Sequence, residues 1–369
     1  MTARLNYFES RVAQTLYGGQ GPAVRWHRES SACPADAAVA AVEILQAPAF
    51  SGERTGLAVL HLRFGADPVG DLAGLCDLSS SPAGAANRSR LQALMPDGVT
   101  IPSQVRRAST LAHVTFGGAA QPTMSPAYGS WPARDQWLWC LASAAPESLF
   151  PPDPEDPSLF EGRVRFSADW QALVLRDGVA FVGTSPDPGG ENVFHAAAET
   201  YVHSIYLDVL LLGRMQANAL NTLANQIATI GLDRLGAGQL EVLEGRLIEL
   251  RRTFGRDHIT AHGKGNEILR QYFAQHRVPE LRARLVDDLA DTARYVEAAG
   301  ARSVNAVLGL VTVLGLPFGL SYAAGALWGG SGARSFAVWT AVGAVASLAA
   351  VLLPPVRAML RAISRRIDD

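Results

Sequence analysis

The spacing of hydrophobic positions changes once along the chain, near residue 192. Residues 1–192 alternate short apolar runs with Gly, Pro and Ser, which is typical of strands linked by loops and short helices. A proline-rich segment at 150–157 predicts an exposed acidic loop, because proline cannot continue a regular element. We therefore expect a mixed α/β domain over 1–192. Its predicted strands are 39–45, 56–64, 111–116 and 136–142.

The clearest local signal lies at Asp177 and Gly178. These two residues separate a β-rich run at 172–175 from another at 179–182. The Asp-Gly dipeptide favours a type I′ turn, whose two central residues need positive φ. A β-hairpin is predicted here.

From Val193 onward the apolar positions follow three-four spacing, which predicts long helices. The first ends near Gly231, and a second runs over 240–276 with a bend at Gly255 or Gly263. Pro279 opens a third helix, which we expect to continue to about Trp328 over roughly 75 Å. Residues 193–302 are therefore expected to form a helical hairpin and a stalk.

Two stretches near the C-terminus contain no charged side chain: one between Arg302 and Arg334, the other between Arg334 and Arg357. About 20 apolar residues suffice to cross the roughly 30 Å hydrocarbon layer. They predict two transmembrane helices within 303–353, joined by a short outer loop at 329–335. The expected fold class is α+β: a cytoplasmic α/β domain, a long helical hairpin, a stalk helix and a C-terminal two-helix transmembrane hairpin.

Arginines flank the predicted spans on one side, and a basic tail at 354–369 follows them. Basic residues beside spans stay in the cytoplasm. We therefore expect a protein of the plasma (inner) membrane with both termini on the cytoplasmic side and with lipid as a partner. The N-terminus lacks the layout of a secretory signal, which agrees. The flanking arginines are Arg294, Arg302, Arg357, Arg361, Arg365 and Arg366.

Charge and cysteine content limit which partners and sites the sequence predicts. The formal net charge is −2, so no overall field favours nucleic acid as a partner. Lys264 is the only lysine, which indicates codon bias, so arginine alone does not indicate phosphate recognition. Cys33, Cys76 and Cys140 have no paired spacing and are expected to be small apolar residues in a reducing cytosol.

The order of these parts, with Pro317, the pair Ala324-Gly325 and the segment 328–331 in the first span, resembles the CorA-like two-transmembrane metal ion transporters. Members of that family have a proline in mid-helix, an Ala-Gly pair and then Gly-Met-Asn at the outer mouth. The resemblance implies a homo-oligomer, most simply a pentamer, and a helix kink at Pro317. It covers about the last 200 residues, and the methionine and asparagine are absent here.

That absence changes the expected outer mouth, formed by Gly329, Gly330, Ser331 and Arg334. Family members bind a hydrated divalent cation there through polar groups of the loop. Here the only charge is Arg334, which a cyclic oligomer would repeat and which disfavours an approaching cation. A weakly selective pore therefore gains weight over Mg²⁺ uptake.

Small or polar residues recur every seven positions in the first span, at Asn305, Thr312, Gly319 and Ala326. Such a face either lines a water-filled pore or packs closely against another helix, as Gly315 and Gly319 could. Both interpretations stay open.

Two other clusters could bind metal. Asp287, Asp288 and Asp291 crowd one turn of the stalk, where CorA-like proteins hold regulatory cations, so a divalent cation is the one cofactor considered. The alternative is ion pairing along the helix, from Arg284 to Asp288 and from Asp291 to Arg294.

His258 and His262 are four residues apart, but the sequence offers no third ligand, so an ordinary polar face is the alternative. The sequence has no phosphate-binding glycine loop, GxSxG or HExxH motif, so no catalytic residue is nominated and no enzyme is expected.

More loosely, the segments 175–182, 260–263 and 275–281 resemble an uncharacterised group of actinobacterial membrane proteins. Some of these accompany conflict systems with caspase-like proteases and TPR proteins. The sequence therefore predicts a gated, weakly selective CorA-like channel or defence effector with a cytosolic sensing domain. The alternatives are a divalent-cation transporter, and a membrane-anchored adaptor that binds a cytosolic protein or is cut by a protease.

Overall fold

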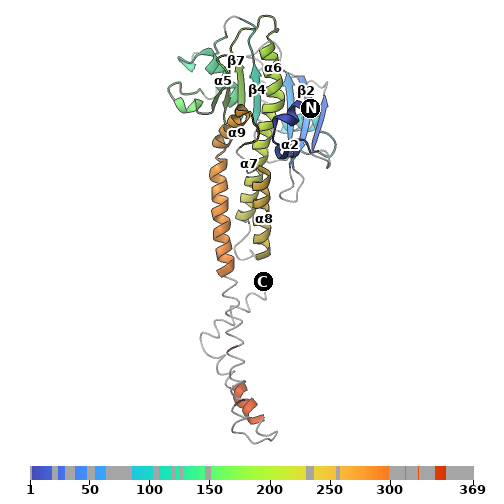
Figure 1. The fold of residues 1–369 in the computed structure, drawn as a ribbon, viewed down its shortest axis with the longest axis vertical. Helices are drawn as coiled ribbons and strands as arrows, with labels where there is room; N and C mark the ends of the chain where they lie inside the picture. Colours follow the sequence, from blue (N-terminus) through green and yellow to red (C-terminus); the bar gives the residue numbers. More distant parts are fainter. Residues whose placement is uncertain are drawn as a thin grey trace. The chain divides into compact units, whose positions relative to one another are not determined.

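The computed structural model describes most of the first 298 residues and little beyond them. The described ranges are 2–18, 24–29, 38–47, 55–63, 85–102, 108–118, 121–124, 128–145, 151–229, 237–254 and 258–298, with 312, 323 and 337–345. The chain divides into two compact units. One comprises residues 1–230 and 242–286, and the other comprises 231–241 and 287–369. The sheets and their covering helices all belong to the first unit (Figure 1).

The first sheet is antiparallel, with strands β1 (Arg25–Glu29), β2 (Ala38–Gln46) and β3 (Gly56–Arg63) in that order. Side chains alternate between its two faces. One face carries Val42 and Leu60, which pack with Met95 just after α4 (Ala85–Leu94). Residues 43, 45, 59 and 61 lie on the opposite face, which carries both charged and apolar side chains.

The second sheet has the order β4-β7-β6-β5, and β4 is parallel to β7 while the other pairs are antiparallel. The strands β6 and β7 are buried along their whole length. Alternate residues therefore pack into two cores. The strand bounds are β4 Thr110–Val114, β5 Arg163–Arg165, β6 Trp170–Val174 and β7 Gly178–Gly183.

Helix α5 (Ala133–Ser143) covers one face of the second sheet, where Leu173 and Val182 pack with its Trp137 and Leu138. The other face packs Val174 and Phe181 against the long helices and the N-terminal helices α1 (Thr2–Tyr7) and α2 (Ser10–Tyr17). The second sheet is thus the central layer between two helical layers.

One nearly continuous helix runs from α6 (Val193–Tyr201) through a π-helical turn, η3 (Val202–Tyr206), into α7 (Leu207–Thr229). Asn192 caps its start by accepting a hydrogen bond from the backbone of Phe194 at 3.0 Å. Helix α8 (Ala237–Phe254) runs beside α7 (Figure 1), and α9 (Gly263–Gln275) packs on α7. Residues 278–298 are also helical.

These helices confirm the long periodic stretch from Val193. The second stretch, predicted as one helix over 240–276 with a bend, is instead two helices, α8 and α9, and residues 258–262 before α9 are not helical. The strands predicted at 39–45, 56–64 and 111–116 are confirmed as β2, β3 and β4. Residues 151–156 form no regular element, as predicted, and a short 3₁₀ helix, η2, follows at Pro157–Phe160. The predicted third helix is helical through 298, and its continuation to Trp328 lies outside the described residues apart from 312 and 323.

The strand predicted at 136–142 is wrong, because this segment belongs to α5. Eight successive residues of the helix, from Asp135 to Ala142, are buried. A helix buried all round shows no amphipathic period, so a short apolar run cannot be told from a buried strand. Pro132, which directly precedes the helix, was the available start signal.

The hairpin predicted at Asp177 and Gly178 is confirmed as β6–β7, but the reason given for its glycine is wrong. Gly178 is not among the glycines with positive φ. A Cβ at this position would instead lie 2.2 Å from Thr110 Oγ1 and 2.6 Å from the Ala142 carbonyl oxygen. The glycine permits close approach of β4 and α5 rather than a left-handed turn.

The structure contradicts the predicted transmembrane hairpin. No helix among the described residues is both long and apolar enough to cross a bilayer. The sequence measures the length of an uncharged stretch, whereas a span also requires one continuous helix over that length. Of the predicted spans at 303–353, only 312, 323 and 337–345 are described. The expectations of a membrane channel and of ion transport, which depend on that hairpin, are corrected with it.

Candidate functional site: a buried charge network with a row of histidines

A fully buried carboxylate, Asp208 in the first turn of α7, is the centre of the most elaborate polar cluster among the described residues. Arg4 of α1 binds it through two hydrogen bonds, Nε to Oδ2 at 2.9 Å and Nη2 to Oδ1 at 2.8 Å. Arg25 of β1 donates from Nη1 to Oδ1 at 2.6 Å, and the hydroxyl of Tyr17 donates to Oδ2. One carboxylate thus joins α1, α2, β1 and α7.

A second buried carboxylate, Glu43 of β2, continues the network. Arg25 donates to Glu43 Oε2 from Nη2 and, at 3.0 Å, from Nε, so this one guanidinium bridges both acids. His27 Nδ1 lies 3.1 Å from Glu43 Oε1, and His61 Nε2 lies 3.5 Å from the same oxygen. All these groups come from one face of the first sheet.

Strand register explains that gathering. Residues directly opposite each other in an antiparallel pair share a face. Arg25 lies opposite Leu45, His27 opposite Glu43, and Ala41 opposite His61. The alternation that directs Val42 and Leu60 to one core therefore directs the charged residues to the opposite face of the sheet.

Histidines extend the cluster toward the second sheet. The ring centroids of His27 and His61 are 6.4 Å apart, and those of His61 and His203 are 6.1 Å apart. His203 lies in the π-helical turn η3, a local irregularity that is frequent at functional sites. His113 of β4 lies opposite Phe181, on the face that packs against the long helices.

The electrostatic environment differs sharply along this row. Burial alone would raise the pKa of Glu43, but His61 and Arg25 outweigh it and hold that pKa at about 2. Burial lowers the pKa of His113 to about 4, and His203 and His195 add to the effect. Burial also lowers the pKa of His203; His61 and Arg63 act in the same direction, and Glu199 opposes them.

The buried tyrosine and arginine of the network keep their neutral-pH protonation states. Burial and the nearby charge of Asp208 raise the pKa of Tyr17, so its hydroxyl stays a donor. Burial disfavours the charge on Arg25, yet Asp208 and Glu43 raise its pKa. The core of the network therefore holds two carboxylates, Asp208 and Glu43, against two guanidiniums, those of Arg4 and Arg25.

This arrangement is suited to coupling the elements that it joins. Each buried charge has an opposite partner, as buried ions require. Among the described residues, no group of three His, Cys, Asp or Glu side chains is placed to hold a metal ion. What the network can do is link the position of the first sheet to that of α7, with a strength that depends on protonation.

The acidic cluster predicted for metal binding lies elsewhere. Asp287, Asp288 and Asp291 are all exposed in the helix at 278–298. Asp291 accepts from Arg294 Nη2 at 2.6 Å, the helical ion pair that the alternative interpretation expected. The regulatory cation site gains no support.

His258 and His262 do not share a helix face, because they precede α9 in a non-helical segment. His262 stacks on Tyr7 with ring centroids 4.6 Å apart, and His258 Nδ1 lies 3.2 Å from Asn266 Nδ2. Both histidines take part in local packing.

The predicted pore and mouth residues stay predictions. Asn305, Gly319 and Ala326 lie outside the described residues, as do the kink residue Pro317 and the mouth residues Gly329, Gly330, Ser331 and Arg334. Thr312 is described and helical.

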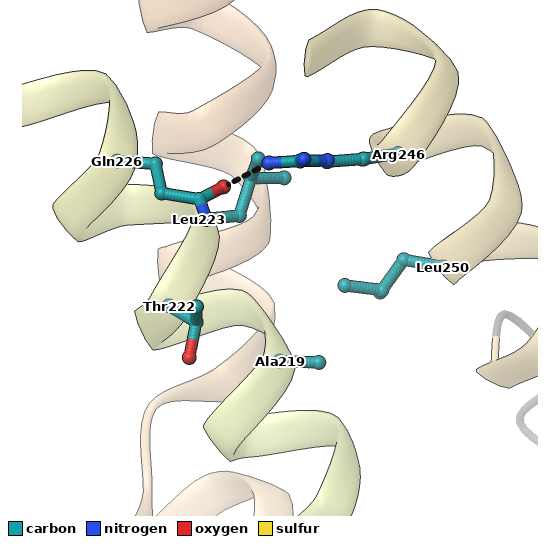
Figure 2. A pocket seen from close by; sticks show the side chains of 6 residues that line it. All are labelled: Ala219, Thr222, Leu223, Gln226, Arg246 and Leu250. Carbon is teal, nitrogen blue, oxygen red and sulfur yellow. Dashed lines mark hydrogen bonds between the residues drawn. The ribbon is translucent and has the colours of Figure 1, made fainter. Parts of the chain in front are cut away.

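A surface depression lies between α7 and α8 (Figure 2). It has a volume of about 210 Å³ that includes open solvent, and Arg246 Nη1 donates across it to Gln226 Oε1 at 2.7 Å. Its other lining residues are Ala219, Thr222, Leu223 and Leu250. The hydrogen bond and the apolar lining fit helix packing better than ligand binding.

The sequence did contain a signal for the charge network. Asp208 interrupts the apolar run Leu207 to Leu212, and Glu43 interrupts the strand run Val42 to Leu45. A single acid within a hydrophobic run is expensive to bury unless it is paired. The partners of Asp208, however, lie 183 to 204 positions away along the chain, which local spacing cannot reveal.

Comparison with known proteins gives no match: no family model, curated protein or solved structure is similar to this chain. The resemblance to CorA-like proteins, the expected homo-oligomer and the expected localisation therefore stay predictions.

Proposed function

We propose that this protein is a non-enzymatic sensing adaptor, in which the α/β body receives a signal and the long helix passes it to the α7–α8 hairpin. This is the adaptor alternative of the sequence analysis, without its membrane anchor. The observation that carries the proposal is the position of Asp208. It lies on the helix that forms the hairpin, yet its partners Arg4, Tyr17 and Arg25 come from the N-terminal helices and the first sheet.

The same helix is continuous through the core and into the hairpin. Buried residues occur in successive turns of α7 from Leu207 to Leu223. In α8, Leu250 and Phe254 belong to the same hydrophobic cluster as the helix-facing side of the second sheet. Close-packed interiors transmit small shifts, so a change at Asp208 can alter hairpin packing.

Cysteine accessibility tests this transmission. Leu250→Cys places a thiol at a position that is 2% exposed, where labelling reports opening of the hairpin. Cys140, which is 1% exposed beside the second sheet, reports global unfolding in the same protein. Cys33 and Cys76 are replaced by Ser so that two thiols remain.

We expect Asp208→Asn to raise the labelling rate of the hairpin thiol introduced by Leu250→Cys at least about tenfold, since a change of 1.4 kcal/mol corresponds to that factor. Cys140 should stay the slower thiol throughout, which shows that the hairpin opens without global unfolding. Asp291→Asn makes the same chemical change at an exposed ion pair and should have no effect. An unchanged labelling rate of the hairpin thiol in Asp208→Asn would show that the network acts only locally, and the adaptor proposal would be wrong.

A further inference from the structure

The first sheet is attached to the rest of its unit in an unusual way. In the part of the chain that the structure describes, no backbone ladder joins its strands to those of the second sheet. Its inner face, which carries residues 43, 45, 59 and 61, instead contacts the rest of the unit (the body) through side chains. Leu45, Leu57 and Val59 join the main core, and the charge network lies beside them. An attachment of this kind depends on charge state, whereas a backbone ladder does not.

Histidines line this attachment from both sides. His27 and His61 come from the first sheet, His203 from the turn η3, and His113 from the second sheet. Charged and titratable groups face them from every neighbouring element: Arg25 and Glu29 of β1, Glu43 of β2, Arg63 of β3, Arg4 of α1, Tyr17 of α2, His195 and Glu199 of α6, and Asp208 of α7.

Counting those charges shows what acid would do. With neutral histidines, Asp208 and Glu43 balance Arg4 and Arg25 in the buried part of the network. Protonation of His113 and His203 would add positive charges beside a site whose two buried carboxylates are already paired with Arg4 and Arg25. Like charges a few ångströms apart in a partly buried site repel strongly.

We propose that this junction is a proton-sensitive latch: protonation of His113 and His203 releases the first sheet from the η3–α7 helix while the second sheet stays folded. The latch defines a stimulus for the sensing role proposed above. It stands on the geometry of the junction alone, so it can hold whether or not the hairpin responds.

The lowered pKa values support the direction of the switch. Burial keeps the pKa of His113 at about 4 and lowers that of His203, so both are neutral in the closed junction. Once the sheet separates, water reaches the rings and their ordinary pKa returns toward 6.5. The open form therefore binds protons that the closed form excludes, and it gains population as the pH falls from about 6.5 toward 4.

A distance measurement across the junction tests the latch. Spin labels are placed at two exposed positions, Arg28→Cys on β1 and Ala197→Cys on α6, with Cys33 and Cys76 replaced by Ser. At pH 7.5 we expect one short distance. At pH 5.0 we expect a second, longer distance, with the far-UV circular dichroism retained.

Two variants separate the latch from general acid effects. His113→Gln combined with His203→Gln should shift the acid midpoint of opening down by about one pH unit or more, because the two groups whose pKa burial lowers in the closed junction are lost. His276→Gln is the matched control. Burial lowers the pKa of His276 to about 4, and the nearby Arg214 and Arg176 act in the same direction. His276 follows α9, so it belongs to neither of the two labelled elements, β1 and α6. That control should leave the opening midpoint unchanged.

Three outcomes would overturn the latch. The distance between the labels could stay the same from pH 7.5 to 5.0, or open equally in the double histidine variant. It could also change only together with a loss of circular dichroism, which would show acid unfolding of the whole unit. If the distance responds to pH but labelling of the hairpin thiol does not respond to Asp208→Asn, the latch is correct and the transmission to the hairpin is not.

Discussion

The two sheets of this protein are stabilised in different ways. The second sheet is the middle layer of the fold, and β6 and β7 are buried on both faces by apolar residues. The first sheet packs its outer face on α4, and it meets the body through a face that mixes Leu45 with the charged Arg25 and Glu43. One fold can thus combine a pair of strands buried by apolar residues with a sheet whose attachment depends on charged side chains.

The largest effect is expected from the apolar core of the second sheet. Phe181 is fully buried, and its ring centroid lies 5.4 Å from Tyr206 and 5.6 Å from Trp170. Phe181→Ala should lower the free energy of unfolding by about 3–5 kcal/mol, measured by urea denaturation. Leu60→Ala, a partly buried residue on the outer face of the first sheet, should cost less. Equal costs would remove the distinction between the two sheets.

Acid should weaken the protein through His113. Its pKa is about 4 in the folded state against 6.5 for an ordinary histidine, so the unfolded chain binds the extra proton in between. The free energy of unfolding should therefore fall as the pH falls from 6.5 to 4, by up to about 3 kcal/mol. Glu43, with a pKa of about 2 against 4.5, contributes stability that is lost only below pH 4.5.

Urea denaturation at a series of pH values measures this dependence. His113→Gln should flatten the curve between pH 4 and 6.5 and leave the region below pH 4 in place. A curve as steep as that of the unmodified protein would show that His113 is not held neutral.

Removing the central carboxylate should have a smaller effect. Asp208→Asn leaves Arg4 and Arg25 without their anion, and losing one partner of a buried pair is costly. Because the Arg4 side chain is 25% exposed, we expect a loss of about 2–3 kcal/mol rather than the 3–5 of a fully buried pair. Asp291→Asn, the exposed counterpart, should change the free energy of unfolding by less than about 0.5 kcal/mol. Similar losses in both variants would contradict a special role for Asp208.

The smallest effects concern two glycines. Gly178→Ala would drive a methyl group against Thr110 and Ala142 at the edge of the second sheet, and should cost about 1–3 kcal/mol. Gly245 lies in α8 with no atom within 4 Å of its would-be Cβ. Gly245→Ala should stabilise the protein by about 0.5–1 kcal/mol, since alanine favours helix. Thermal unfolding curves measure both, and a destabilising Gly245→Ala would reveal packing on that face.

Sequence patterns predicted the elements whose hydrophobic period matches their exposure. The alternation in β2 and β3 and the three-four spacing from Val193 reflect elements with one buried side. The same reasoning failed for α5, because a helix buried on all sides has no polar face to reveal its period. It also failed for the membrane hairpin, since no helix in the described part of the chain is long and apolar enough to cross a bilayer.

Sequence spacing did not predict the charge network around Asp208, and the reason is different. Asp208 meets Arg4 and Arg25 across more than 180 positions of sequence, and only the folded sheet and helices place them together. The sites that spacing did suggest, such as Asp287 with Asp291, consist of residues that are close together in the sequence. Local spacing favours solvated ion pairs, and that is what Asp291 and Arg294 form.

The central claim is that the first sheet can separate from the body while the second sheet stays intact. Native-state hydrogen exchange at pH 7.5 tests it directly, with increasing but subdenaturing urea. Amides of β1–β3 should exchange through an opening of lower free energy and weaker urea dependence than amides of β6–β7. Phe181→Ala should lower the opening free energy of β6–β7 and leave that of β1–β3 unchanged, because the second sheet is intact when the first one opens. If the amides of both sheets instead share one opening free energy, and Phe181→Ala lowers it equally in both, the two sheets unfold as one unit and the account is wrong.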